Sequence, residues 1–179
     1  MNVTRGSASA SLANRGAGLE RFLDELHATY LARGQACVFR TPPPVRILKP
    51  QGKGTFLAVH AASGPPDYTG FAAGKGVCFD AKECADTRWN FGHLPVHQAV
   101  ALDAAQGQGA FCFLYLRLAG GDFVLPWATL GPRWHAWDTA PGRAPAGTAS
   151  ITVGDAIALG TKVTGKGWLT ALPHLSESP

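Results

Sequence analysis

The sequence is poor in charged residues and contains no long apolar run. Asp, Glu, Lys and Arg make up 16% of its 179 residues, against roughly 25% in an ordinary soluble domain. No stretch approaches the roughly 18 uninterrupted apolar residues that a membrane helix needs, so we expect no membrane-spanning segment. Residues 1–13 also lack the apolar stretch of a secretory signal and are predicted to form a flexible N-terminal arm.

Cysteine and histidine patterns typical of metal sites are missing as well. The four cysteines form no C-x-x-C pair and show no zinc-like spacing, which argues against a structural zinc site. Cys37, Cys78 and Cys112 lie in apolar, strand-like runs. We therefore expect buried thiols in a reducing cytoplasm, or in the host cytoplasm if the chain is virus-encoded. The histidines at positions 27, 60, 93, 135 and 174 share no ligand spacing and are expected in ordinary core or surface positions.

Hydrophobic residue types nevertheless reach 46% of the chain, which is ample for a core and excludes a disordered tail. The length suits one domain, which we place at residues 14–179. An apolar stripe at helical spacing predicts a helix over residues 14–33, and a second helix is predicted over 96–105. Strands are predicted at residues 35–40, 45–48, 55–61, 68–72, 76–82, 111–118 and 122–125. This order predicts an α/β fold; beyond Trp127 the pattern weakens, and residues 139–150 are predicted to form a loop.

The few charges are unevenly placed. Residues 1–66 hold eight basic and three acidic side chains, whereas residues 67–86 hold two basic and four acidic ones. A basic surround with an acidic centre is what a protein needs to hold a polyanion and to place metal ions against it. Ordinary solvated surface charge would give the same counts, so charge alone leaves both interpretations open.

The candidate chemistry concentrates at Asp67 and in the run Asp80-Ala81-Lys82. Side chains alternate faces along a strand, so Asp80 and Lys82 point the same way, on a polar face, while Phe79 and Ala81 point into the core. Asp67 precedes the partner strand of a predicted hairpin and can bring a second carboxylate to the same place. Two carboxylates suit Mg²⁺, and Lys82 can stabilise charge that develops on a phosphate. The alternative is a surface strand with an Asp–Lys pair. The apolar residues before Asp80 favour a central strand, and charged side chains are rarely found there without a functional role, because burying them is costly.

Several sequence blocks occur in a fixed order. They are Asn14-Arg15-Gly16, the proline-rich residues 42–47, Asp67-Tyr68-Thr69-Gly70, Phe79-Asp80-Ala81-Lys82-Glu83, Phe91 with His97-Gln98, and residues 109–116. This ordered set resembles the RecU-type Holliday junction resolvases of the PD-(D/E)XK nuclease superfamily, over residues 14–137 and more loosely to 172. The resemblance implies a restriction-endonuclease-like core, with a mixed central β-sheet flanked by helices and a short projecting stalk.

The resemblance also implies a function: a structure-selective endonuclease that resolves four-way DNA junctions by metal-dependent phosphodiester hydrolysis. A homodimer would cut two opposing strands and leave ends that a ligase can seal, with Mg²⁺ as cofactor and Mn²⁺ as a substitute. Asp67 and Asp80 would hold the metal, with Lys82 beside the attacking water. Glu20 would add a further carboxylate, and Gln98 would support the site from the second helix. The residues expected to contact DNA are Arg15, Arg46, Lys49, Lys53 and Lys75. A recombinase is a further candidate partner.

The chain departs from the family pattern in three places. Asp80 stands where the family usually has glutamate, Pro43 stands where it has threonine, and the stretch between Ile47 and Asp67 is shorter than the family's stalk. Two alternatives stay open: another PD-(D/E)XK nuclease that acts on branched or duplex DNA, and a non-catalytic protein that binds junctions or regulates recombination. Equal cutting of junction and duplex would favour the first, and junction binding without cleavage would favour the second.

Overall fold

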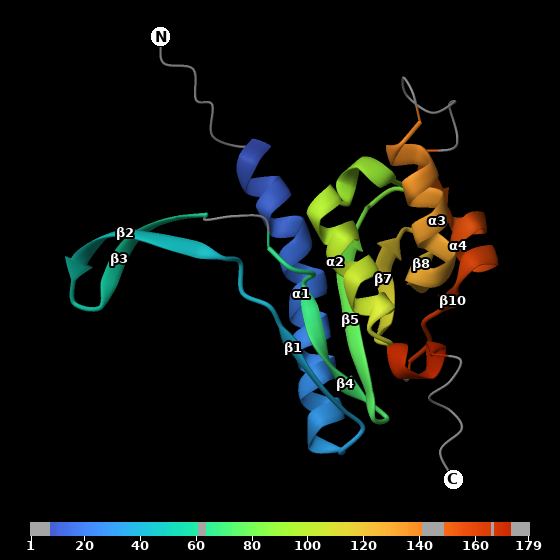
Figure 1. The fold of residues 1–179 in the computed structure, drawn as a ribbon, viewed down its shortest axis with the longest axis horizontal. Helices are drawn as coiled ribbons and strands as arrows, with labels where there is room; N and C mark the ends of the chain where they lie inside the picture. Colours follow the sequence, from blue (N-terminus) through green and yellow to red (C-terminus); the bar gives the residue numbers. More distant parts are fainter. Residues whose placement is uncertain (1–7, 61–63, 141–148, 166, 173–179) are drawn as a thin grey trace.

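The computed structural model describes residues 8–60, 64–140, 149–165 and 167–172. The described residues form a six-stranded sheet with the order β1-β4-β5-β7-β8-β10 (Figure 1). β5 and β7 are parallel, and the other neighbouring pairs are antiparallel. These strands span Ala36–Arg40, Tyr68–Ala72, Lys75–Glu83, Phe111–Leu118, Gly121–Pro126 and Thr161–Lys162. The predicted α/β class with a mixed central sheet is therefore confirmed.

Helices lie on both sides of the sheet (Figure 1). α1 (Ala8–Ala32) covers one face, where Leu19 and Leu23 pack in a buried cluster with Phe79. The other face is covered by three helices: α2 (Val96–Gly107), α3 (Trp127–Asp138) and α4 (Val153–Leu159). Its buried cluster includes Cys78 and Leu114. Since neighbouring side chains of β5 enter opposite clusters, this strand is buried on both sides.

A two-stranded ribbon projects away from the sheet (Figure 1). It is formed by β2 (Val45–Gly52) and β3 (Thr55–His60), and its described side chains are exposed. Residues 42–44, three consecutive prolines, connect β1 to this ribbon. The predicted projecting stalk is therefore present. A smaller pair, β6 (Arg88–Asn90) with β9 (Ser150–Thr152), and the short turns η1 (Phe91–His93) and η2 (Trp168–Ala171) complete the described chain.

The predicted elements up to residue 125 are present, with shifts at their ends. α1 begins at Ala8, six residues before the predicted start, and β2 runs on to Gly52 because it pairs with β3 as far as the turn. The elements after Trp127 were missed: α3 holds Gly131 and Pro132, which interrupt a helical sequence pattern. Residues 1–7 of the predicted arm and 141–148 of the predicted loop lie outside the described residues.

The cysteines and the buried histidine occupy mostly ordinary core positions. All four cysteines are free; Cys78 and Cys112 are buried as expected, whereas Cys37 is partly exposed. His27 is buried and its Nε2 accepts a hydrogen bond from Trp168 Nε1 at 3.1 Å. Burial lowers the pKa of His27 to about 4, so it is neutral at pH 7. In the described part of the chain, no helix has both the length and the apolar character needed to cross a membrane.

Gly70 lets β4 approach β1 closely. A Cβ atom at this position would overlap the backbone oxygen of Cys37 and stand 2.6 Å from the Cα of Val38. Backbone atoms cannot move aside without disturbing the β1–β4 pairing, so we expect Gly70→Ala to lower the free energy of unfolding by about 1–3 kcal/mol. Gly18→Ala is the control, because open space surrounds that helical position and alanine favours helix. Urea unfolding measures both variants, and equal stabilities would contradict the close approach.

Candidate active site

The register of β4 and β5 brings the two aspartates together. Tyr68 pairs with Phe79 in this antiparallel ladder, so Asp67, just before Tyr68, lies across from Asp80, just after Phe79. Asp67 Oδ2 accepts a hydrogen bond from the backbone N–H of Ala81 at 3.0 Å. The backbone oxygen of Asp67 accepts another, from the neighbouring β1 end, at 2.8 Å. Asp67 is thus fixed by both its backbone and its side chain.

Asp80 is completely buried, with an exposed fraction of 0%. Strand alternation predicted a position on a polar strand face; that part of the prediction is wrong, because α2 packs over this face of β5. Lys82 Nζ lies 2.5 Å from Asp80 Oδ2 and forms an ion pair with it. Among the described residues, Oδ1 of Asp80 has no hydrogen-bond partner. The predicted proximity of Asp80 and Lys82 is confirmed.

The surroundings of Asp80 favour its protonated form. Burial is the main cause, since water cannot solvate the carboxylate, and it raises the pKa of Asp80 to about 7. The positive charge of Lys82 acts in the opposite direction, and the negative charge of Asp67 raises the pKa further. A bound cation would add to the positive charge of Lys82 and favour the ionised carboxylate.

Lys82 is held in place from the second helix. Its Nζ donates a hydrogen bond to Gln98 Oε1 at 3.2 Å, and Gln98 is itself buried on α2. The ammonium group therefore stands between a carboxylate and an amide. The side chain of Lys82 keeps 20% of its surface exposed.

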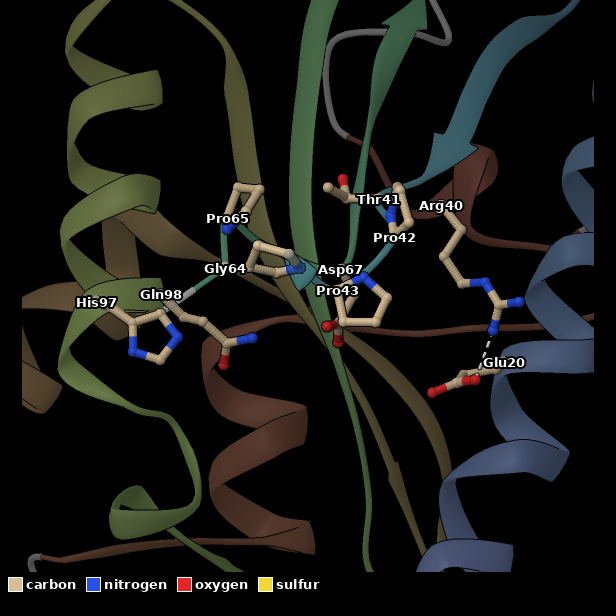
Figure 2. Close-up of a pocket in the computed structure, with 11 residues that line it drawn as sticks. Glu20, Arg40, Thr41, Pro42, Pro43, Gly64, Pro65, Asp67, His97 and Gln98 are labelled. Atoms are coloured by element: carbon tan, nitrogen blue, oxygen red, sulfur yellow. Dashed lines mark hydrogen bonds and ion pairs between the residues drawn. The ribbon is translucent and has the colours of Figure 1, made fainter. Parts of the chain in front are cut away.

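An open cleft of about 900 Å³ lies beside Asp67. Its lining residues come from α1, from the link between β1 and β2, from the segment before β4 and from α2: Glu20, Arg40, Thr41, Pro42, Pro43, Pro44, Gly64, Pro65, Asp67, His97 and Gln98. Figure 2 shows Asp67 near the centre, with His97 and Gln98 on one side and Glu20 and Arg40 on the other. The cleft therefore opens at the base of the projecting ribbon.

Glu20 faces this cleft from the wall opposite Gln98 (Figure 2). Its Oε2 accepts a hydrogen bond from Arg40 Nη1 at 2.5 Å, so it is bound to the cleft wall. Sequence reasoning missed Arg40, Thr41 and His97 as cleft residues. The position of Arg40 between a predicted strand and the proline-rich link was the available indication, because strand ends commonly carry functional side chains.

The basic residues expected to contact DNA fall into separate places. Arg46 and Lys49 lie on β2, and Lys53 lies in the turn at the tip of the ribbon. Lys75 begins β5, five residues or roughly 17 Å before Asp80, at the end of the sheet away from the ribbon (Figure 1). The structure therefore does not bring it to the cleft. Arg15 lies within α1, and its side chain is outside the described part.

The oxygen donors of Asp67 and Asp80 fit a magnesium ion. Both side chains offer carboxylate oxygens, and hard oxygen ligands are what Mg²⁺ requires. No cluster of three or more His, Cys, Asp and Glu side chains that could hold a metal occurs within the described residues. Mg²⁺ is commonly bound by one or two carboxylates, with waters and substrate phosphates completing its shell. The donor set thus suits Mg²⁺ better than zinc.

The fold and the site define an α/β protein with an acid–lysine candidate active site at the end of its central sheet. A family model described as Recombination protein U (RecU) matches residues 14–144. This chain belongs to the RecU family.

Curated proteins named Holliday junction resolvase RecU are similar along most of the chain. The protein from Bacillus pumilus is 30% identical over 137 residues, covering 73% of this chain and 67% of the relative. The protein from Geobacillus thermodenitrificans is 30% identical over 143 residues, covering 75% of this chain and 71% of the relative. The protein from Lactobacillus delbrueckii subsp. bulgaricus is 28% identical over 174 residues, covering 93% and 80%. Among solved structures, Hjc, a Holliday junction resolvase from Archaeoglobus fulgidus, gives a TM-score of 0.45 at 13% identity, covering 78% of this chain and 92% of that one.

Asp80 links the stability of the fold to pH. Its pKa of about 7 in the folded protein lies above the ordinary value of 3.8, so the folded state binds the proton more tightly. Stability from this group is therefore lost as pH rises from about 4 to about 7. Asp80→Asn removes the titration, and we expect the variant to gain stability relative to the wild type across this window, in EDTA.

Thermal unfolding midpoints at intervals between pH 4 and pH 8 measure this effect. Asp86→Asn alters an exposed acid and should follow the wild type throughout. A constant difference between Asp80→Asn and the wild type at every pH would contradict a buried carboxylate with a raised pKa.

Proposed function

We propose that this protein is a structure-selective endonuclease that resolves four-way DNA junctions by metal-dependent hydrolysis. Membership of the RecU family and the names of the curated relatives support the substrate. The observation that carries the chemistry is Asp80, a buried carboxylate that is ion-paired with Lys82 and lies across the strand pair from Asp67, which lines an open cleft. A buried carboxylate is costly to a fold that only binds DNA, even when it is ion-paired, and it is useful to one that binds a catalytic cation.

Asp67 and Asp80 would hold a Mg²⁺ ion, for which Mn²⁺ would substitute. When bound, this ion offsets phosphate charge and lowers the pKa of a water molecule. Lys82, fixed by Asp80 and Gln98, directs its positive charge at the negative charge that develops on the phosphate during attack. Gln98 acts through Lys82, by holding the ammonium in place. The oxygen of water forms a bond to phosphorus, and the bond from phosphorus to the 3′ oxygen breaks, leaving ends that a ligase can seal.

The projecting ribbon suits a junction, because it starts at the cleft. The proline-rich link that leads into β2 lines the cleft itself, and Arg46, Lys49 and Lys53 follow along the ribbon to its tip. DNA that contacts Arg46 would lie close to the cleft, and Lys53 would extend the contact to the tip of the ribbon, whereas Lys75 would contact DNA only at the far end of the sheet. Phosphate contacts by such side chains fix position and register.

Two copies of the chain would present two clefts to two opposing strands, so we include a homodimer in the proposal. Phe39 and Phe71 support it, because they are 61% and 65% exposed. Cys37 pairs with Phe71, and Phe39 with Thr69. The two aromatic rings are therefore diagonal neighbours on one face of β1 and β4. Exposed neighbouring aromatic side chains are typical of surfaces that contact another chain.

Cleavage of a synthetic four-way junction tests the function. We expect paired nicks in opposing strands with Mg²⁺ or Mn²⁺ and none in EDTA, and little cutting of a linear duplex of the same sequence. Asp80→Asn and Lys82→Ala should lower the cleavage rate by at least roughly 10²–10³ while junction binding persists. Asp86→Asn should cleave like the wild type.

Three results would count against parts of this account. Full cleavage by Asp80→Asn would overturn the site, and equal cutting of junction and duplex would overturn junction selectivity. Junction binding by the wild type, without cleavage in the presence of either metal ion, would overturn the assignment as an enzyme.

A further inference from the structure

The cleft holds a charged network that the proposed hydrolysis does not use. Arg40, the last residue of β1, donates from Nη1 to Glu20 at 2.5 Å, as the dashed line in Figure 2 shows. Its Nε lies 3.5 Å from Oδ2 of Asp24. The other oxygen of Asp24 accepts a hydrogen bond from the hydroxyl of Tyr68 at 3.2 Å. The guanidinium group is thus held against α1, on the wall that faces Gln98 across the cleft.

This network can exchange partners easily. The side chains of Arg40 and Glu20 are 48% and 49% exposed, and ion pairs this exposed add little to stability because water and salt compete with them. A phosphate group is a stronger partner, since a guanidinium donates two parallel hydrogen bonds to it. Among the described residues that line the cleft, Arg40 is the one arginine or lysine. It is therefore the lining side chain best suited to a phosphate.

The acidic side chains around the cleft outnumber the basic ones, so the partner of Arg40 affects how well the cleft can receive a phosphate. The acids Glu20, Asp24, Asp67 and Asp80 face only Arg40 and Lys82 within the network and the catalytic cluster. This excess of negative charge repels DNA. While Glu20 neutralises Arg40, the cleft wall has no cation to offer an incoming phosphate.

We propose that Arg40 binds a phosphate of the DNA backbone in the cleft, and that Glu20 occupies Arg40 in the free protein in place of that phosphate. DNA and Glu20 compete for one guanidinium group. When DNA binds, the carboxylate of Glu20 is released into the cleft that it shares with Asp67. The inference rests on the proposed function, since it assumes that the cleft receives junction DNA.

Junction affinity in EDTA, where the proposed enzyme does not cut, tests the competition. Arg40→Ala should raise the Kd for a labelled four-way junction about tenfold and reduce the slope of log Kd against log salt concentration by about 1. Glu20→Gln frees Arg40 and should lower the Kd several-fold. Glu25→Gln on α1 and Arg33→Ala just after α1 change exposed charges outside the cleft, so each should shift the Kd by less than about twofold.

The double variant Glu20→Gln/Arg40→Ala separates competition from a general change in charge. If Glu20 acts through Arg40, the gain from Glu20→Gln disappears when Arg40 is absent. An equal gain with and without Arg40, or an effect of Arg40→Ala no larger than that of Arg33→Ala, overturns the proposal. If Arg40→Ala does not fold, Glu20→Gln still tests the proposal, because it must lower the Kd for the junction more than Glu25→Gln does. A wild-type protein without junction affinity would instead overturn the proposed function.

Discussion

A buried carboxylate, in a strand that is covered on both faces, is the constraint around which this structure is arranged. Asp80 is 0% exposed. One face of its strand, β5, packs against the buried cluster that contains Phe79, and the other face packs against the cluster on the side of α2. Burial of such a group costs stability at neutral pH, and the ion pair with Lys82 offsets only part of that cost. This cost of burial falls on one residue, which lies across the strand pair from Asp67 on the cleft lining.

Each other part of the site is fixed relative to Asp80 by ordinary secondary structure. The antiparallel register of β4 and β5 fixes the position of Asp67. The alternation of side chains along β5 puts Lys82 on the same face as Asp80, and α2 supplies Gln98. The opposite wall is set by α1 and the end of β1, where Glu20 and Arg40 meet. Gln98 on one wall accepts a hydrogen bond from the ammonium group of Lys82, and the other wall holds the guanidinium group of Arg40. Arg40 is thus the cation on the described cleft lining, and Lys82 lies one hydrogen bond away from that lining.

Much of this site was predictable from the sequence, because it depends on short-range rules. Alternation along one strand predicted that Asp80 and Lys82 lie together, and a hairpin predicted the approach of Asp67. The covered face of β5 could not be predicted, since it depends on where α2 packs. The pairing of Arg40 with Glu20 joins residues twenty positions apart through the packing of α1 on β1. The distance of Lys75 from Asp67 follows from the same hairpin, because its turn lies at the other end of β4 and β5. After Trp127 the helices are short and interrupted by Gly and Pro, so periodicity could not reveal them.

The claim that the buried carboxylate of Asp80 binds a cation can be tested without DNA. Calorimetric titration of Mg²⁺ at pH 6, in two buffers of different ionisation enthalpy, counts the protons released when the ion binds. With a pKa of about 7, Asp80 is largely protonated at pH 6 and must lose its proton to become a ligand. The account predicts release of nearly one proton per ion in the wild type, little release at pH 8, and greatly weakened binding in Asp80→Asn. Mg²⁺ binding at pH 6 without proton release, or with unchanged affinity in Asp80→Asn, would contradict it.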